Sequence, residues 1–397
     1  MKDFTVEGDM LTAYRGHDER VVIPEGVRAI GRRVFCGLPY IREIILPKSM
    51  EHIDEDNFSD CPHLRFHEQD GVRYLGAEDT PYLVLVEAQK DTVAHDVKDG
   101  CRLIASHAFD ACERLSRITL PSSVAFIGDM AFYGCTALGD ITLPAGLQVI
   151  GDCAFEDCAL TRITLPDGLL RVGRCAFSCV TLKEVTLADS LTHIGRDAFT
   201  RNPLCFTEDE AGYYLGSAAC PYLCFMQPAD RCARTLRVHE GCRFIYTGAC
   251  MRTTVEEVVL PDGLLHIGQD AFRECPSLRR VRLPQSVGHI DACAFASCAA
   301  LGEVTLPCGA LTVGEGAFMG CSALEEITLP CAAVEDYAFS DCTSLRAVQL
   351  GEGSRLCGEY IFSDCTALRT LTLPQALKGR SDETLLEGCS DVQVRYG

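Results

Sequence analysis

One pattern of apolar residues recurs along this 397-residue chain with a spacing of 22–23 residues. It reads L-x-x-I-x-L-P-x-x-V-x-x-I-G-x-x-A-F-x-x-C, and a clear copy runs from Leu115 to Cys135. A fixed period of this length predicts a solenoid, in which each repeat forms one coil and contacts only its neighbours. We number fourteen coils by the residue in the proline column: Pro24, Pro47, Lys98, Pro121, Pro144, Pro166, Ala188, His239, Pro261, Pro284, Pro307, Pro330, Gly351 and Pro374.

Each part of the repeat has a structural interpretation. The segment L-x-x-I-x-L ends in alternating apolar positions, as a half-buried strand does, and Pro ends the strand because it has no N–H to donate. V-x-x-I is a second apolar pair that turns back towards the core. G-x-x-A-F-x-x-C is interpreted as a helical turn in which Gly permits the bend. We therefore expect a right-handed solenoid of parallel β-strands with short helical or 3-10 turns, about fourteen coils and capped ends.

Two segments break the period, and they resemble each other. FHEQDGVRYLGAEDTPYLVLVEA begins at Phe66, and FTEDEAGYYLGSAACPYLCFMQPA begins at Phe206. Both are predicted to be β-hairpin insertions, because strand-like runs flank a turn that contains Gly. The predicted organisation is, in order, an N-terminal hairpin cap (1–19), repeats 1–2 (20–65), a hairpin insertion (66–97), repeats 3–7 (98–205), a second hairpin insertion (206–237), repeats 8–14 (238–380) and a C-terminal cap (381–397).

Copies such as ITLPSSVAFIGDMAFYGCTAL, from Ile118 to Leu138, together with the hairpin insertions, resemble the BspA-like leucine-rich-repeat family of bacterial proteins. The resemblance covers essentially the whole chain. It implies an adhesin-like scaffold whose partner is a host matrix or cell-surface protein or a glycan. The N-terminus MKDFTVEGDM lacks a signal peptide, which predicts a cytoplasmic location; the resemblance implies the cell surface if an export signal was removed.

Composition narrows the range of partners. The chain carries 56 acidic and 36 basic residues, a net charge of −20, which disfavours nucleic acid and anionic membrane surfaces. The longest charge-free stretch, 211–229, is interrupted by Gly and Pro and belongs to the second hairpin, so we expect no membrane insertion. We expect a monomer.

The chain contains 25 Cys, and eleven of them fill one column of the repeat. In that column Cys is interpreted as a compact, weakly polar residue that hydrogen-bonds the turn backbone, so we expect structural free thiols. Such thiols fit a reducing environment. Four further thiols at the second hairpin are the alternative, a zinc site without a C-x-x-C knuckle: Cys205, Cys220, Cys224 and Cys232.

Signatures of catalysis are missing from the sequence. It has no phosphate-binding G-x-x-x-x-G-K-[ST], no G-x-S-x-G and no H-E-x-x-H. One column holds His52, His193, His266 and His289, but two neighbouring histidines without a third ligand are a weak metal site. We predict no catalytic residue, no cofactor and no metal, and hence no enzyme; an enzyme with a cryptic site is the remote alternative.

The positions that depart from the repeat are the candidates for partner binding. Charges on the strand face change from coil to coil, although alternating charges also form ion pairs between strands. Tyrosines of the hairpins are the second set, which either anchor a partner or pack against the next coil. The candidates are Arg117, Asp140, Arg162, Glu184, Glu257, Arg280, Glu303, Glu326, Tyr74, Tyr82, Tyr214 and Tyr222. A passive structural module of a larger assembly is the competing hypothesis.

Overall fold

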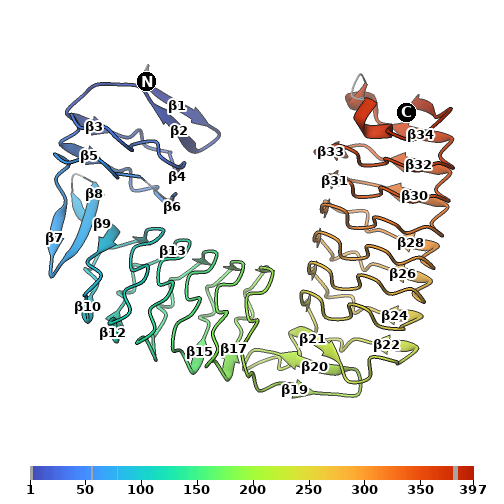
Figure 1. Cartoon of the computed structure of the whole chain (residues 1–397), viewed down its shortest axis with the longest axis horizontal. Helices are drawn as coiled ribbons and strands as arrows, with labels where there is room; N and C mark the ends of the chain where they lie inside the picture. Colours follow the sequence, from blue (N-terminus) through green and yellow to red (C-terminus); the bar gives the residue numbers. More distant parts are fainter. Residues whose placement is uncertain (1–2, 55–56, 78, 379–382) are drawn as a thin grey trace. The chain divides into compact units, whose positions relative to one another are not determined.

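The computed structural model describes residues 3–54, 57–77, 79–378 and 383–397. The remaining residues of the predicted caps, repeats and first hairpin lie outside the described residues. The chain forms two compact units, residues 1–205 and 206–397, and each is described by itself. Within each unit short strands stack coil upon coil (Figure 1). The predicted parallel β-solenoid is confirmed, with about sixteen turns.

The first face of the solenoid is built from the L-x-x-I-x-L segments. Neighbouring strands pair in parallel and in register, one coil apart, as in Arg162↔Glu184 and Ile163↔Val185. The strands of this face are β3 (Arg20–Val22), β5 (Glu43–Ile45), β10 (Ala94–Asp96), β12 (Arg117–Thr119), β15 (Arg162–Thr164) and β17 (Glu184–Thr186) in the first unit, and β22 (Thr235–Arg237), β24 (Glu257–Val259), β26 (Arg280–Arg282), β28 (Glu303–Thr305), β30 (Glu326–Leu329), β32 (Ala347–Leu350), β34 (Thr370–Leu373) and β35 (Gln393–Tyr396) in the second.

The second face is built mainly from the V-x-x-I segments, which also pair in parallel. Its strands in the first unit are β2 (Met10–Tyr14), β4 (Ala29–Ile30), β6 (His52–Ile53), β9 (Thr80–Ala88), β11 (Leu103–Ile104), β13 (Phe126–Ile127), β14 (Val149–Ile150), β16 (Arg171–Val172) and β18 (His193–Ile194). In the second unit they are β21 (Cys224–Pro228), β23 (Phe244–Ile245), β25 (His266–Ile267), β27 (His289–Ile290), β29 (Leu311–Val313), β31 (Ala332–Val334) and β33 (Arg355–Leu356).

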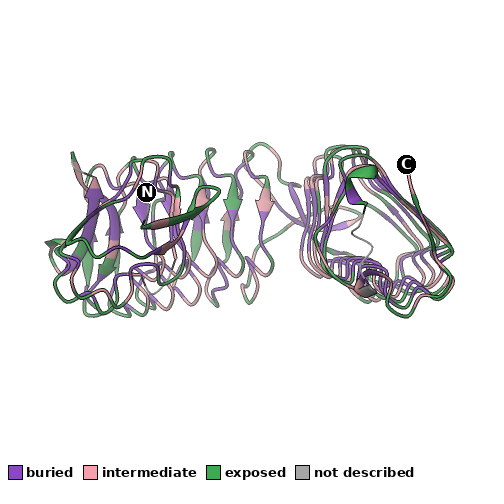
Figure 2. Cartoon of the chain, turned by 90° about the horizontal axis from the view of Figure 1, so that it is seen from above, coloured by how far each residue is buried: buried purple, intermediate pink, exposed green. Residues whose placement is uncertain are grey.

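The core is the inside of the coils. Coils of the second unit, viewed nearly along their stack, are three-sided with buried residues lining the interior (Figure 2). In coil 4 the apolar positions of the repeat other than the partly buried Leu120 are at most 7% exposed: Leu115, Ile118, Val124, Ile127, Ala131, Phe132 and Cys135. One coil has no partner for this surface, so burial requires stacking.

Two side-chain columns connect successive coils. The Phe rings stack nearly parallel, with centroids 5.2 Å apart for Phe109–Phe132 and 5.1 Å for Phe132–Phe155. Ten of the eleven column cysteines donate from Sγ to the carbonyl oxygen at the Phe position of the coil before, as Cys135 does to Phe109 at 3.2 Å. The cysteine column therefore hydrogen-bonds one coil to the next.

The turn that follows the second strand is not the helix that the sequence predicts. In the described chain the assigned helices are two short 3-10 segments near the C-terminus, η1 (Gln375–Leu377) and η2 (Glu383–Leu386). Coil turns instead place a residue in the left-handed region two positions before Phe, for example Cys153 at φ 54° and Cys175 at φ 53°. A left-handed residue interrupts right-handed helical geometry, so the turn cannot continue as a helix.

Both hairpin insertions are part of the stack. The first has β7 (His67–Gln69), β8 (Val72–Ala77) and β9, and β8 contacts β5 of the first face while β9 pairs in parallel with β11 of the second. The second has β19 (Thr207–Glu208), β20 (Gly212–Leu215) and β21, and β21 pairs with β23 in the same way. The predicted hairpins are therefore present, and their last strands supply the second-face strand of an extra turn.

The two ends of the chain extend the sheets. At the N-terminus β1 (Phe4–Glu7) and β2 form an antiparallel hairpin, and β2 pairs in parallel with β4. At the C-terminus β35 adds in parallel to β34. Each end strand covers the backbone edge of the coil beside it, which limits edge-to-edge association.

Candidate functional site

Charged side chains of the strand face pair with their neighbours one coil away. In the first unit Arg117 lies 2.7 Å from Asp96, and this guanidinium lowers the pKa of Asp96 by hydrogen bonding. In the second unit Arg280 lies 3.2 Å from Glu257, and Glu303 lies 3.4 Å from Arg282. Four predicted partner-binding residues, Arg117, Glu257, Arg280 and Glu303, thus have ion-pair partners within the sheet. For these four residues the structure agrees with the alternative interpretation, in which alternating charges form ion pairs between strands.

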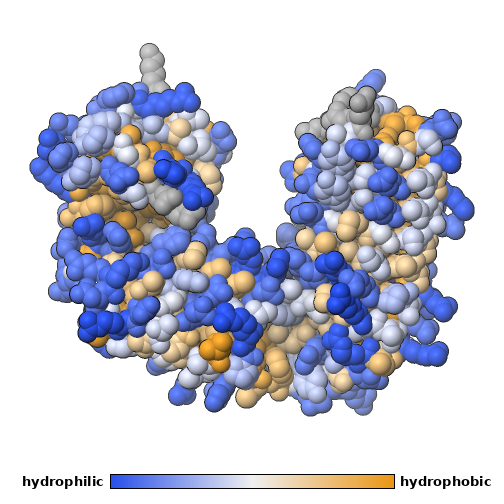
Figure 3. All heavy atoms as spheres, in the orientation of Figure 1, coloured by the Kyte–Doolittle hydropathy of each residue, from blue (hydrophilic) through white to orange (hydrophobic). Residues whose placement is uncertain are grey.

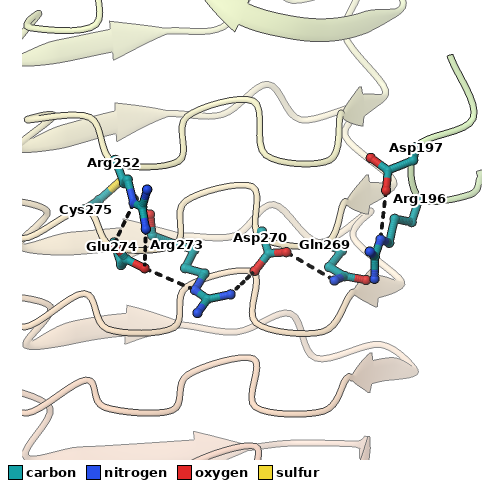
Figure 4. Close-up of polar contacts among 8 residues, drawn as sticks. All are labelled: Arg196, Asp197, Arg252, Gln269, Asp270, Arg273, Glu274 and Cys275. Carbon is teal, nitrogen blue, oxygen red and sulfur yellow. Dashed lines mark hydrogen bonds and ion pairs between the residues drawn. The ribbon is translucent and has the colours of Figure 1, made fainter. Parts of the chain in front are cut away.

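The turns of the second unit continue this pairing. Arg252 contacts Glu274 at 2.7 Å, and Arg273 bridges Glu274 at 3.5 Å and Asp270 at 3.2 Å (Figure 4). Hydrogen bonding to Arg252 lowers the pKa of Glu274. Pairs between exposed groups contribute little stability individually, so their main effect is that opposite charges on neighbouring coils neutralise each other.

The other predicted strand-face residues, Asp140, Arg162, Glu184 and Glu326, are exposed, and no ion pair is found for them among the described residues. Asp140, Arg162 and Glu184 belong to three consecutive coils, 5 to 7, of the first unit. Strands β15 and β17 place Arg162 opposite Glu184. These three residues form a small surface with both signs of charge, whereas Glu326 lies in coil 12 of the second unit.

The predicted hairpin tyrosines divide into two kinds. Tyr74 and Tyr214 are wholly buried, so they are not available to a partner. Tyr74 Oη lies 2.5 Å from His95 Nε2, and Tyr214 Oη accepts a hydrogen bond from the backbone N–H of His239 at 3.1 Å. These two tyrosines therefore pack against the next coil, which is the alternative predicted for them from the sequence.

Tyr82 and Tyr222 are only partly buried. Each ring meets the buried tyrosine of its own hairpin edge to face, with centroids 5.4 Å apart in both hairpins. Tyr222 also stacks on His239 with centroids 3.8 Å apart. They line the hairpin surface and support its buried aromatic residue.

A cleft of about 870 Å³ lies in the first unit, at the first hairpin. One wall is the turn of coil 2, including Phe58, Ser59 and Asp60, and the opposite wall is the turn of coil 3 at Ala105–Asp110. Residues of the hairpin, such as Arg73 and Glu87, line it as well. In the space-filling view this region is hollowed, with apolar side chains showing inside it (Figure 3).

The cleft exists because the stacking of turns is interrupted there. Between coils 3 and 4, the N–H groups of Phe109 and Ala111 donate to carbonyls of the next coil at 2.7 Å. The corresponding groups in coil 2 are the N–H of Phe58 and of Asp60, and neither donates to an acceptor in the described chain. Two residues of the cleft lining therefore carry backbone donors that have no acceptor among the described residues. Backbone donors that have no protein acceptor bind water or a ligand instead.

Carboxylates outnumber cations around the cleft. Its lining contains Asp54, Asp60, Glu87 and Asp110 against Arg73 and His107. Arg73 is already shared between Glu87 at 3.4 Å and Glu68 at 3.8 Å. Burial raises the pKa of the Cys61 thiol, which also lines the cleft, so it stays protonated at neutral pH. The cleft suits a ligand that carries positive charge and offers hydrogen-bond acceptors. No periodic feature of the sequence indicated it.

Side chains that could jointly ligate a metal form two sets among the described residues: Cys153, Glu156 and Cys175, and His52, Asp54 and Asp129. The alternative zinc set at the second hairpin is not one of them. Within the second unit Cys224 is wholly buried, with its Sγ 3.8 Å from Met226 Sδ, while Cys220 donates to Gly241 and Cys232 is exposed. In the histidine column, His266 Nε2 lies 2.8 Å from Asp291 Oδ1.

One thiol has a lowered pKa. Hydrogen bonds from Cys298 and Thr253 lower the pKa of Cys275. The side chain is wholly buried in the core of the second unit, however, and its Sγ lies 3.1 Å from the Cys250 carbonyl oxygen. A substrate could not reach it, so Cys275 is part of the thiol column and not a candidate nucleophile.

A family comparison agrees with this architecture. The BspA-type leucine-rich-repeat region matches residues 14–77, 102–208, 243–333 and 331–394, in six copies. The chain belongs to the BspA-type leucine-rich-repeat family. No curated protein is similar enough to count as a match. Among the described residues, no helix is long and apolar enough to cross a membrane.

Solved structures of several bacterial proteins are similar to this chain. A leucine-rich-repeat protein from Bacteroides ovatus is 22% identical over 95% of this chain and 83% of its own, with a TM-score of 0.38. A leucine-rich cell surface protein from Faecalibacterium prausnitzii is 22% identical over 99% and 92%, with a TM-score of 0.32. A leucine-rich-repeat protein from Eubacterium ventriosum is 19% identical over 83% and 95%, with a TM-score of 0.42. Likenesses of this size give no basis for transferring a function.

Proposed function

We propose that this protein is a non-catalytic scaffold that binds other proteins, and that the cleft beside the first hairpin takes an extended, basic segment of the partner. The observation that carries the proposal is a pair of backbone donors in the lining of a cleft of about 870 Å³: Phe58 N–H and Asp60 N–H have no acceptor among the described residues. Alternate N–H groups on one edge are what an extended peptide pairs with when it adds to a protein backbone.

Electrostatics supports the choice of a basic partner. Four carboxylates line the cleft against one guanidinium and one imidazole, and the whole chain has a net charge of −20. An anionic protein attracts cationic partners over a distance and repels anionic ones. The surface of Asp140, Arg162 and Glu184 is a second proposed contact, because its charges have no ion-pair partner among the described residues.

Peptide display provides the test. A library of random peptides is selected on the immobilised protein, and the enriched peptides are measured against Ser59→Trp, which fills the cleft from its exposed wall. Ser122→Trp makes the same change at an exposed turn outside the cleft lining. We expect enriched peptides to be rich in Lys and Arg, to lose at least about tenfold in affinity on Ser59→Trp, a difference of roughly 1.4 kcal/mol, and to bind Ser122→Trp normally.

Equal binding to both variants, or a selection that enriches nothing, would contradict the proposal. Salt gives an independent measurement, because attraction between exposed charges weakens as ionic strength rises. Affinity that is independent of salt between about 50 and 500 mM would exclude the electrostatic part of the proposal.

A passive structural module remains the competing function, and the ion pairs between coils favour it, since they leave much of the strand face with matched charge. An adhesin-like role against matrix proteins, cell-surface proteins or glycans is the finer proposal and comes from the family. It predicts saturable binding to immobilised matrix proteins that Ser59→Trp weakens. A passive module predicts binding to none.

A further inference from the structure

The turns of coils 5 and 6 bring two thiols and a carboxylate together on the surface of the first unit. The Sγ atoms of Cys153 and Cys175 and a carboxylate oxygen of Glu156 all lie within 4.8 Å of one another. All three side chains are partly buried and open to solvent on one side. None of them lines the cleft of the proposed function, so this site stands independently of it.

The solenoid fixes the relative positions of these groups. Cys153 and Cys175 occupy the same place in adjacent coils, each with left-handed backbone near φ 54°, so their Cα–Cβ bonds point the same way. Backbone hydrogen bonds on both sides of each thiol hold the turns together: Cys153 N–H donates to Arg174, Phe155 N–H to Ala176 and Cys175 N–H to Arg196, at 2.6–2.9 Å. The Phe155 and Phe177 rings, two residues after the thiols in each coil, stack with centroids 5.3 Å apart.

This juxtaposition does not recur with the repeat. The same column holds Met130 in coil 4 and Asp197 in coil 7. In the second unit Cys293 stands between Asp270 and Gly316. Among the described residues, two neighbouring thiols in this column with a carboxylate between them occur only in coils 5 and 6, although 25 cysteines are distributed along the chain. Thiols that serve only to pack the turn do not need a carboxylate within ligand distance.

We propose that Cys153, Cys175 and Glu156 form a binding site for one thiophilic divalent cation of the zinc type. Two thiolates and one carboxylate are suitable ligands for Zn²⁺, which takes four ligands in a tetrahedron with bonds of about 2.0–2.3 Å. The three ligand atoms already lie within 4.8 Å of one another, so side-chain rotations suffice to close the site around a metal. The solvent side leaves the fourth position to a water molecule.

The charges around the site favour a cation. Two thiolates and Glu156 carry three negative charges when a metal displaces the thiol protons. Arg201 approaches Glu156 only to 3.8 Å and Asp157 to 3.0 Å, and Arg174 lies 3.9 Å from Asp152. Arg201 and Arg174 therefore each have a carboxylate other than Glu156 as partner, which leaves Glu156 able to ligate a metal.

Cobalt is the spectroscopic probe for this site. The full-length protein, reduced with a phosphine and freed of metal, is titrated with Co²⁺, and absorption is recorded in the near-ultraviolet region of thiolate-to-cobalt charge transfer and the visible region of tetrahedral Co²⁺. We expect one Co²⁺ per chain with thiolate absorption, displaced by one equivalent of Zn²⁺.

Matched variants assign the signal. Cys153→Ser combined with Cys175→Ser should abolish the thiolate absorption, whereas Cys293→Ser, the same change at the same column position in the second unit, should leave it intact. Glu156→Gln should keep the thiolate absorption and weaken Co²⁺ binding at least about tenfold. The Ser variants are expected to fold, because coil 7 has a polar Asp197 at the same position with φ 56°. Circular dichroism checks this.

Two results would overturn the proposal. One is a reduced protein that gives no thiolate absorption with Co²⁺ while its thiols titrate as free. The other is an absorption that persists in a folded Cys153→Ser, Cys175→Ser variant, which would place the metal at other cysteines.

Discussion

At the scale of single residues, the glycine column shows how the repeat specifies close stacking. A Cβ on Gly173 would lie 2.4 Å from the Gly151 carbonyl carbon, and one on Gly195 would lie 2.6 Å from that of Gly173. These glycines do not have positive φ, so the bend itself does not require them. They are required because the backbones of adjacent coils approach each other too closely for any side chain.

Replacing one of these glycines should therefore be costly. We expect Gly173→Ala to lower the free energy of unfolding by about 1–3 kcal/mol, because the added methyl must push two coils apart. Gly139→Ala makes the same change where the nearest atom would be 3.9 Å away, and it should cost less than about 0.5 kcal/mol. Urea denaturation followed by circular dichroism measures both, and equal effects would refute this explanation of the column.

At the scale of elements, the first hairpin is secured to the stack by a buried polar contact. Tyr74 of β8 and His95 of β10 are 0% and 3% exposed, and Tyr74 Oη lies 2.5 Å from His95 Nε2. Burial lowers the pKa of His95, so the imidazole is neutral at pH 7. A strand of the hairpin is thereby joined to a strand of the first face beneath the surface of the hairpin.

Removing the hydroxyl should loosen this junction. We expect Tyr74→Phe to cost about 1–3 kcal/mol, because it leaves an imidazole nitrogen buried without a partner. Adding His95→Leu should recover part of that loss, and the double-mutant cycle gives the coupling energy. Tyr82→Phe, on a half-buried ring of the same hairpin, is the control and should change little. Additive losses in the cycle would show that the two side chains do not interact.

At the scale of the whole molecule, the buried thiols make the free energy of unfolding depend on pH. Burial raises the pKa of Cys101, Cys135 and Cys321 to about 12 in the folded protein, against about 8.5 for an unperturbed thiol. The folded chain therefore holds protons that the unfolded chain releases in alkali. The contribution of these thiols to stability is complete below about pH 8.5 and is lost as the pH rises towards 12.

Alkaline unfolding should consequently be steep. Each such thiol lowers the free energy of unfolding by about 1.4 kcal/mol per pH unit above pH 8.5, so the urea midpoint in reductant should fall clearly between pH 8.5 and 10.5. Cys321→Ala should reduce the fall in the free energy of unfolding per pH unit by the contribution of one thiol. A midpoint that does not move over this range would show that the buried cysteines are not protonated thiols, and a thiol count after unfolding without reductant would then reveal whether they are disulfides.

Much of the fold could be predicted because the information was local and repeated. The apolar columns, the cysteine column and the pairing of Arg280 with Glu257 all follow from residues one period apart in the sequence. The helical prediction for the turn was wrong because most of its left-handed residues, such as Met130, Cys153 and Tyr337, are not Gly and so do not signal positive φ. Tyr74 and Tyr214 seemed available because an aromatic residue in a break of the repeat has no periodic position from which to infer burial.

The sequence by itself determined that the chain is a stack of coils in register, because every apolar column recurs at 22–23 residues and can be buried only against its own copy in the next coil. Only the tertiary structure decided where the hairpin strands pair, with β8 against β5 and β9 against β11. That choice is made by backbone hydrogen bonds between distant segments, which leave no pattern of side chains. The same pairing interrupts the ladder of turns and creates the cleft, where the N–H groups of Phe58 and Asp60 have no acceptor among the described residues.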